Sequence, residues 1–267
     1  MAPEKWTAHP RWWPGSGFTV EVELASDLAP LAPGKFAMLS PADGKGPLVP
    51  RPFSVLDQPS PRHLTFLVQV MGPGTQALAR VPIGGSLRVL VPLGNGFTLP
   101  DPSRPVVLVA GGVGCVPFLL YLRARAAAGA ADQTRLLYGA RSQQFLWERE
   151  ALEAASCAVE FMTEDGSLGF HGNVLAAMEQ GLNAGTIPKE ALFCACGPSG
   201  LLRAFWSRAK ELGLDSQVSL ETYMGCGFGA CNACPVATDP LGGLGDWPWA
   251  KACTAGPVFA VQDILFA

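Results

Sequence analysis

The stretch VVLVAGGVGCVPFLLYL, residues 106–122, decides the fold of this 267-residue chain. Its 17 residues carry no charge, so in length and composition it approaches a short membrane-spanning helix. It is interrupted, however, by Gly111, Gly112, Gly114 and Pro117, which are typical of a buried strand, a tight turn and a helix start. We therefore expect a soluble strand–turn–helix unit whose glycine turn offers a helix N-terminus to a dinucleotide phosphate. The motif is shorter than the full Gly-x-Gly-x-x-Gly fingerprint, so a plain structural turn is the alternative.

Strand-like and helix-like segments alternate downstream of this unit. The expected strands are 134–138, 158–162, 191–196 and 216–221, and the expected helices end near 128 or span 146–155, 173–180 and 199–212. Because strands that alternate with helices form parallel layers, the pattern predicts a doubly wound parallel sheet. Cys196, Gly197 and Pro198 form a second glycine turn after a strand, at the edge where open α/β sheets place ligands.

Upstream, residues 17–94 contain short strand-like runs separated by proline and glycine. The runs at 18–24, 35–39, 51–56, 64–70 and 86–92 predict a small antiparallel barrel or sandwich. The motif RPFS (51–54) opens one run and GPGT (72–75) follows another. An arginine fixed on a strand can bind a pyrophosphate bidentately, and glycines let backbone amides approach phosphate. Taken singly, each motif has a structural alternative as a strand start or an ordinary turn.

Four of the eight cysteines gather near the C-terminus with the spacing C-x4-C-x2-C-x18-C: Cys226, Cys231, Cys234 and Cys253. Structural zinc sites usually combine two short C-x2-C pairs, whereas C-x4-C-x2-C with a distant fourth cysteine is the plant-type [2Fe–2S] order. The small residues at 225, 227, 229 and 230 let backbone amides turn toward the sulfurs. The sequence therefore predicts a [2Fe–2S] cluster, with zinc or unligated thiols as the alternatives.

Charge and composition narrow the class of partner. The net charge is −3, charged residues make up 15% of the chain, and no Lys/Arg-rich run occurs. These features argue against nucleic acid or an anionic membrane surface as the main partner. The first residues lack the apolar core of a signal peptide, so we expect a cytoplasmic chain whose cysteines stay reduced.

The order of motifs resembles the ferredoxin reductase superfamily and, more narrowly, the electron-transfer subunits of two-component, NAD-dependent dihydroorotate dehydrogenases. The resemblance extends from about residue 17 to 266. It is carried by RPFS (51–54), PLGNGF (92–97), GGVG (111–114), YGAR (138–141), EDGS (164–167), CGP (196–198), the cysteine-rich tail and GPVF (256–259). The tail motif is far more specific than the glycine turns.

The resemblance implies three units: a flavin-binding antiparallel β-barrel over 1–102, a doubly wound NAD-binding α/β domain over 103–216, and a small [2Fe–2S] segment over 217–267. It implies that FAD lies on the barrel and that the cluster ligands are the four tail cysteines. Cys196 would be the catalytic residue beside the nicotinamide. The implied FAD residues are Arg51, Pro52, Phe53, Ser54, Val68, Gln69, Val70, Gly74 and Thr75, and the implied NAD residues are Gly111, Gly112, Gly114, Gly197 and Pro198.

Two positions depart from the superfamily pattern. Phe53 stands where many members have tyrosine, so ring packing is kept and a hydroxyl hydrogen bond is lost. Gln69 stands where relatives often carry arginine, so flavin phosphate affinity would rest more heavily on Arg51.

The implied activity is oxidation of dihydroorotate by an FMN-containing catalytic subunit, in pyrimidine biosynthesis. Electrons would then pass through [2Fe–2S] and FAD to NAD+, within a heterotetramer of two catalytic and two electron-transfer subunits. A flavin is needed because nicotinamide exchanges electrons in pairs and the cluster exchanges them singly. The alternatives are a reductase subunit of a hydrogenase, sulfur reductase or transhydrogenase, and a zinc-stapled binding module of another class.

Two further features bear on cofactor and partner. Glu164 and Asp165 would repel a 2′-phosphate and favour NAD over NADP, unless they only form a turn. Trp247 and Trp249 lie between the third and fourth tail cysteines, where they either contact a partner or cover the cluster loop.

Overall fold

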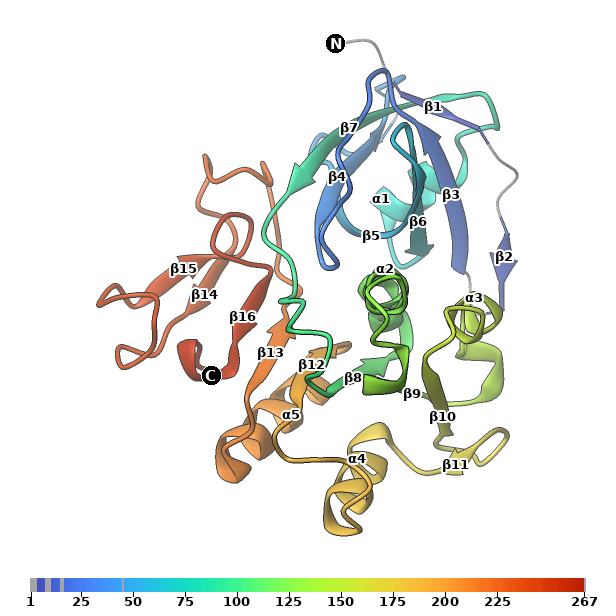
Figure 1. Cartoon of the computed structure of the whole chain (residues 1–267). Helices are drawn as coiled ribbons and strands as arrows, with labels where there is room; N and C mark the ends of the chain where they lie inside the picture. Colours follow the sequence, from blue (N-terminus) through green and yellow to red (C-terminus); the bar gives the residue numbers. More distant parts are fainter. Residues whose placement is uncertain (1–3, 8–10, 15–16, 45, 267) are drawn as a thin grey trace.

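The computed structural model describes residues 4–7, 11–14, 17–44 and 46–266. A β-barrel, a layered α/β unit and a small C-terminal lobe lie side by side (Figure 1). None of the described helices is long and apolar enough to cross a bilayer.

The N-terminal sheet is antiparallel and curls into a barrel. Its order is β1-β7-β4-β5-β6-β3-β2, and β1 also pairs with β3, which closes it. Alternate residues of β3 face the core, with Phe18, Val20 and Val22 buried and Glu21 and Glu23 turned outward, as the period-two pattern predicts. The elements are β1 (Glu4–Trp6), β2 (Trp12–Trp13), β3 (Gly17–Glu23), β4 (Phe36–Pro41), β5 (Arg51–Ser60), β6 (His63–Gln69), α1 (Pro73–Ala79) and β7 (Ser86–Leu93).

The second sheet is the predicted parallel one. Its order is β11-β10-β9-β8-β12-β13-β16, and every pairing is parallel except that of β13 with β16. Every residue of the central strand β8 is buried, as expected for a parallel strand covered on both faces. The strands are β8 (Val106–Gly111), β9 (Thr134–Ala140), β10 (Ala158–Thr163), β11 (Phe170–His171), β12 (Leu192–Cys196), β13 (Ser216–Ser219) and β16 (Val258–Ala260).

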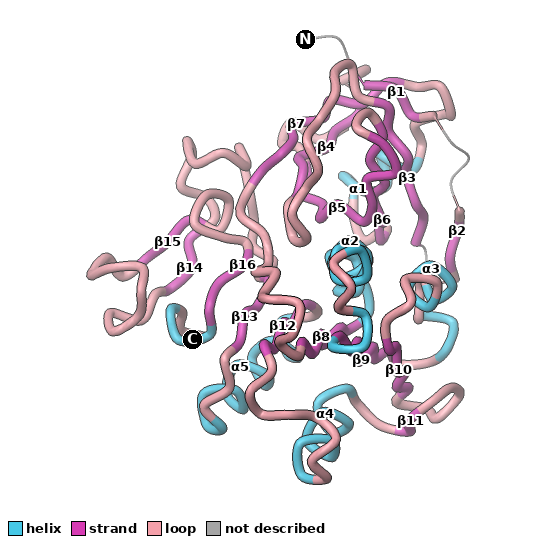
Figure 2. The backbone as a smooth tube through the Cα atoms, viewed as in Figure 1, coloured by secondary structure: helices cyan, strands magenta, loops and turns pink. Residues whose placement is uncertain are grey.

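Helices cover both faces of this sheet. Those on the barrel side are α2 (Val116–Ala127) and α3 (Arg149–Glu153), and those on the far side are α4 (Val174–Asn183) and α5 (Ser199–Leu212) (Figure 2). Alternate β8 residues enter different cores. Leu108 and Ala110 pack with α2, whereas Val107 and Val109 pack with α4 and α5. Because α2 also contacts β5, the barrel rests directly on the α/β unit.

The C-terminal lobe follows β13. It contains an antiparallel pair, β14 (Pro235–Ala237) and β15 (Trp249–Lys251), before the chain returns to the large sheet as β16. The sequence predicts none of these three short strands.

Two sequence expectations were wrong in detail, and one alternative was as well. The helix expected over 146–155 is only α3, because Trp147 is buried with its indole N–H donating to Pro14 O at 3.1 Å, and Glu148 adopts φ 57°. The ordinary turn that the sequence left open at 72–75 is instead the start of α1, with Pro73 at its first position, where a missing N–H costs no helical hydrogen bond. The strand expected over 216–221 ends at Ser219.

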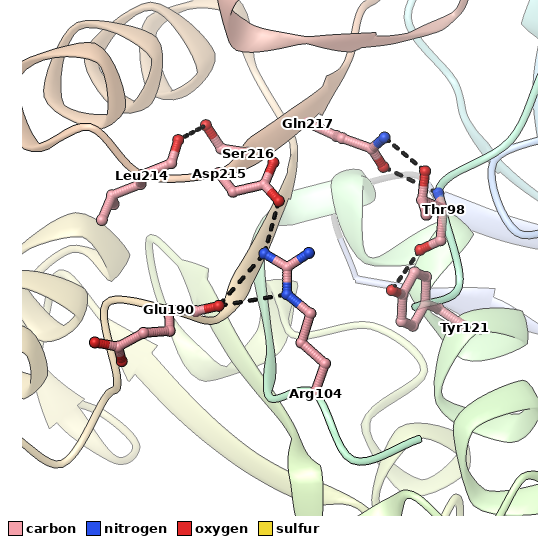
Figure 3. A network of polar contacts seen from close by, with 8 residues as sticks. All are labelled: Thr98, Arg104, Tyr121, Glu190, Leu214, Asp215, Ser216 and Gln217. Atoms are coloured by element: carbon pink, nitrogen blue, oxygen red, sulfur yellow. Dashed lines mark hydrogen bonds and ion pairs between the residues drawn. The ribbon is translucent and has the colours of Figure 1, made fainter. Parts of the chain in front are cut away.

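Residues 94–105, which connect barrel and α/β unit, are fixed by many polar contacts. Tyr121 Oη donates to Thr98 O at 2.7 Å, Gln217 accepts from Thr98 N at 2.9 Å, and Arg104 pairs with Asp215 at 2.6 Å (Figure 3). The guanidinium of Arg125, 1% exposed, donates to four carbonyls of this connector and to a threonine hydroxyl: Pro100, Asp101, Pro102, Arg104 and Thr134 Oγ1.

We expect Arg125→Met to destabilise the protein by about 3 kcal/mol or more, because it leaves four carbonyls and a hydroxyl without their charged donor. Urea denaturation measures this loss. Arg203→Met on the exposed face of α5 is the matched control and should stay within about 0.5 kcal/mol of the parent chain. Equal stability of the two variants would contradict the role given to Arg125.

Candidate functional site

A cleft of about 710 Å³ opens at the carboxyl ends of the parallel strands. Gln69 and Met71 of the barrel form one wall, and residues that end β8, β9, β10 and β12 form the other. This is the edge at which open α/β sheets bind ligands. Of the residues predicted to hold FAD or NAD, Gln69, Gly111, Gly112 and Pro198 line the cleft.

The two glycine turns cross at the floor of this cleft with almost no space between them. A Cβ on Gly114 would lie 2.1 Å from Cys196 O and 2.6 Å from Gly197 Cα. A Cβ on Gly111 would lie 2.6 Å from Leu201 Cδ2. Gly112, in contrast, has φ 53° and open space beside it, so its backbone is accessible from the cleft. The structure therefore brings the two predicted turns together. Gly111 and Gly114 leave no room for a side chain, whereas Gly112 has a positive φ that favours glycine.

Two opposite charges also line the cleft. Arg141 directly follows β9 and Glu164 directly follows β10. The carboxylate of the neighbouring Asp165 is less available to a ligand, because it already accepts hydrogen bonds from Ser167 N at 3.0 Å and from Ser167 Oγ at 2.6 Å. Sequence reasoning paired Glu164 with Asp165 and assigned no role to Arg141, although YGAR (138–141) places that arginine directly after a strand.

Cys196 is 5% exposed and does not belong to the residues that line the cleft. Burial, the largest influence, raises the pKa of its thiol well above the ordinary value, and Glu221 acts in the same direction. The side chain is therefore a neutral thiol behind the cleft floor, and its catalytic role stays a prediction.

The barrel brings its two predicted phosphate motifs together. A Cβ on Gly74 would lie 2.7 Å from Arg51 Nε, so the arginine stem passes directly over this glycine. Arg51 Nη1 donates to Val49 O at 2.7 Å, which orients the guanidinium beside the start of α1. The Thr75 hydroxyl is already engaged, since it accepts from Met71 N and Gly72 N and donates to Gly72 O. Thr75 can therefore offer its backbone N–H, but not a free hydroxyl, to an anion.

The remaining predicted barrel residues differ in how much of their surface is exposed. Pro52, Phe53, Ser54 and Val70 are partly buried, and they leave some surface for a ligand. Val68 is completely buried in the barrel core, so only its backbone can face a bound ring.

The four tail cysteines form two pairs. Cys234 and Cys253 are each 3% exposed, and their sulfurs lie 3.3 Å apart. Cys231 is exposed and Cys226 is partly buried, and Cys226 N donates to Cys231 Sγ at 3.3 Å. None of the eight cysteines, all of which lie in the described part of the chain, takes part in a disulfide.

This paired arrangement fits a two-iron cluster better than one zinc ion. A tetrahedral zinc site draws four sulfurs to within about 3.8 Å of one another, given Zn–S bonds of about 2.3 Å. Across the described ranges, no three His, Cys, Asp or Glu side chains are gathered to hold one ion. A [2Fe–2S] cluster has four cysteine ligands for two irons, so two separate pairs satisfy it.

Backbone amides face the sulfurs, as predicted for this glycine-rich loop. The N–H of Phe228, with smaller contributions from those of Cys231 and Ala230, lowers the pKa of Cys226 to about 6. Burial raises the pKa of Cys253 to about 11, partly offset by the N–H of Gly229. Such amides stabilise thiolate and cluster charge, which completes the fit of these residues to an iron–sulfur group.

Sequence comparisons agree with this geometry. Residues 221–265 match the family model described as the iron–sulfur cluster binding domain of dihydroorotate dehydrogenase B, and residues 108–206 match an oxidoreductase NAD-binding domain. The chain is 33% identical over 244 residues to the electron transfer subunit of dihydroorotate dehydrogenase B (NAD(+)) from Desulforamulus reducens, with 91% of this chain and 90% of the relative covered. The chain belongs to this family.

Other members of the dihydroorotate dehydrogenase B electron transfer family are equally similar. The subunit from Caldanaerobacter subterraneus subsp. tengcongensis is 35% identical, with 88% of this chain and 87% of the relative covered. The subunit from Shouchella clausii is 34% identical, with 92% and 90% covered. Membership makes the chain an oxidoreductase subunit, and its iron–sulfur domain coincides with the paired cysteines.

The chain is also similar in structure to solved flavin-dependent reductases. The NADH-dependent reduced ferredoxin-NADP oxidoreductase, described for flavin-based electron bifurcation, superposes with a TM-score of 0.83 at 25% identity, with 99% of this chain and 90% of that chain covered. The FAD/NAD binding domain of nitric oxide dioxygenase from Vibrio cholerae has a TM-score of 0.67 at 20% identity, with 81% and 98% covered. The second likeness shows the fold alone.

Proposed function

We propose that this chain is the electron transfer subunit of an NAD-dependent dihydroorotate dehydrogenase B and works in the cytoplasm in pyrimidine biosynthesis. The observation that carries the proposal is one chain holding both a nucleotide cleft and two cysteine pairs suited to [2Fe–2S]. When bound, FAD supplies the change between paired electrons at nicotinamide and single electrons at the cluster.

Within this proposal each part of the chain holds one cofactor. Residues 1–102 hold FAD through Arg51 and the amides that begin α1, and residues 103–216 hold NAD in the cleft. Residues 217–267 hold the cluster through the two cysteine pairs. The proximity of Arg51 to Gly74, the open backbone at Gly112 and the amides around Cys226 support these assignments.

The substrate is oxidised on the partner, which we propose to be an FMN-containing catalytic subunit in a two-plus-two heterotetramer. Exposed aromatic side chains around the cluster lobe support a docking face there: Tyr223 (95% exposed), Phe228 (58%), Trp247 (73%) and Trp249 (54%). Aromatic residues are enriched at protein interfaces, and the high exposure of both tryptophans favours contact with a partner over covering the cluster loop.

The test is anaerobic purification followed by cofactor analysis. We expect flavin and iron–sulfur absorption bands, about two iron and two sulfide per chain, and NADH-dependent dye reduction. A colourless protein with bound zinc would overturn the proposal. A second candidate, a reductase subunit of another complex, is favoured by the 0.83 TM-score with the ferredoxin-linked oxidoreductase. Co-purification with a dihydroorotate-oxidising FMN subunit decides between the two.

Glu164 is expected to set the preference for NADH over NADPH. Its carboxylate lines the cleft and would repel a 2′-phosphate, so Glu164→Lys should lower the ratio of kcat/KM for NADH to that for NADPH by about tenfold. Steady-state dye reduction with each nucleotide measures this ratio. Glu160→Gln, four residues earlier on β10 and paired with Arg135, should leave it unchanged. An unchanged ratio in Glu164→Lys would place the ribose elsewhere.

A further inference from the structure

Asn95 makes four hydrogen bonds, all of them to the segment that follows the last tail cysteine. Its backbone N donates to Gly256 O at 2.6 Å. Its Nδ2 donates to Ala255 O at 3.0 Å and to Val258 O at 2.7 Å, and its Oδ1 accepts from Val258 N at 2.9 Å. The Asn95 side chain thus uses both its donor and its acceptor on Ala255 and Val258, while its backbone N–H binds Gly256 between them.

The segment held by Asn95 starts two residues after Cys253, which is buried against Cys234. The preceding Gly94 reinforces the contact, since a Cβ there would lie 2.6 Å from Pro257 Cδ and 2.8 Å from Gly256 O. The turn that carries the fourth cysteine is therefore attached closely to the end of barrel strand β7.

The first cysteine pair is attached to the same edge of the barrel. A Cβ on Gly227, next to Cys226, would lie 2.4 Å from Met38 Cγ of β4 and 3.2 Å from Leu93 Cδ1 of β7. Leu93, Gly94 and Asn95 are consecutive residues. Both cysteine-bearing loops thus contact the same edge of the proposed flavin-binding barrel, where the end of β7 lies beside Met38 of β4.

We propose that Asn95 is a positioning residue that sets the Cys234–Cys253 pair against the Cys226–Cys231 pair and against the barrel. The inference rests on the proposed function, because it concerns residues expected to ligate the cluster. Asn95 acts through the backbone of 255–258 and touches neither sulfur pair itself.

The chemistry of the contact requires an amide. Aspartate has nearly the same shape but cannot donate, so it would face the carbonyls of Ala255 and Val258 with a negative charge. The rest of the connector is fixed independently through Thr98, Gln217 and Arg104 (Figure 3). A change at Asn95 is therefore expected to loosen the cysteine turn without releasing the connector.

The experiment compares Asn95→Asp and Asn95→Ala with Gln58→Ala in the holoprotein. Gln58 is a matched control, because its side chain also makes three hydrogen bonds to backbone, to residues 28, 29 and 31 of a barrel loop. The readouts are the rate of iron release to a chelator, the electron paramagnetic resonance spectrum of the reduced cluster, and NADH-dependent dye reduction as a check on the rest of the fold.

We expect both Asn95 variants to release iron about tenfold faster and to show a shifted paramagnetic resonance spectrum, because residues that position metal ligands typically change metal affinity by this amount or more. NADH-dependent dye reduction should stay at the parental level. Gln58→Ala should match the parent chain in all three. If Asn95→Asp released iron at the parental rate, the inference would be overturned, because the size of the side chain at position 95 would then matter and its amide would not. Faster release in Gln58→Ala, or loss of dye reduction in both Asn95 variants, would overturn it as well, by making the effect a general loss of stability. A parent chain without any cluster would instead refute the proposed function.

Discussion

Gly114→Ala is expected to destabilise the α/β unit by about 3 kcal/mol or more and to abolish NADH-dependent dye reduction. The new Cβ would lie 2.1 Å from Cys196 O and 2.4 Å from Cys196 C. Both are backbone atoms of β12, a central strand paired with β8 on one side and β13 on the other, so neither can move aside cheaply. Relief of the clash requires the turn after β8 to move away from the end of β12, where the cleft floor is formed.

Gly200→Ala is the matched control for this prediction. Gly200 also lines the cleft, but an added Cβ meets nothing within 4 Å and the residue lies in helix α5. Because alanine is the better helix former, the variant should be as stable as the parent chain or more stable. Urea denaturation of the two variants gives the comparison. A Gly114→Ala chain within about 1 kcal/mol of the parent would show that the two turns do not need their close approach.

The elements that sequence predicted well are those whose signal is local. The strand, turn and helix of 106–122 follow from an uncharged apolar run broken by glycines, and the structure reproduces them as β8, a short turn and α2. The barrel strand at 17–23 was equally readable, because its alternation of buried and outward residues is a property of the strand itself.

The elements that sequence missed depend on contacts between distant residues. The helix expected over 146–155 begins only at Arg149, because Pro14, 133 positions before Trp147, accepts the indole N–H of that residue. Arg125 looks like an ordinary helix arginine, and only the folded connector turns it into a buried donor. For the same reason Asn95 is inconspicuous in PLGNGF (92–97), since its partners follow more than 150 residues later.

The candidate site shows the same division. Cysteine spacing predicted which four thiols act together, but not that two of them would form a buried pair and the other two a more exposed one. The glycine turns at 111–114 and 196–198 were recognised singly, whereas their mutual contact needs the β8–β12 pairing. Arg141 was missed because strand order, and not the local motif, places it beside Glu164.

Cys231→Ser is expected to lower transfer of electrons from dihydroorotate to NAD+ in the complex with the catalytic subunit by about a hundredfold or more, while NADH-dependent dye reduction stays. Cys231 is exposed, so the smaller oxygen leaves no cavity and the fold is unaffected. Serine is a poorer ligand for iron than a thiolate, so the Cys226–Cys231 pair can no longer hold its half of the cluster. Anaerobic iron and sulfide analysis, together with both assays, measures the outcome.

Cys157→Ser is the matched control, which tests whether the loss of electron transfer is specific to Cys231 or follows from replacing any cysteine. Cys157 is partly buried, far from the tail in sequence, and donates to Leu122 O, a hydrogen bond that serine can also make. Its variant should keep parental iron content and both activities. If Cys231→Ser lost the cluster yet kept parental transfer to NAD+, single electrons would reach the barrel by another route. The paired cysteines would then stabilise the lobe without taking part in the reaction. Loss of both activities would instead show that the cluster loop, through Gly227 on Met38 and Leu93, supports the barrel itself.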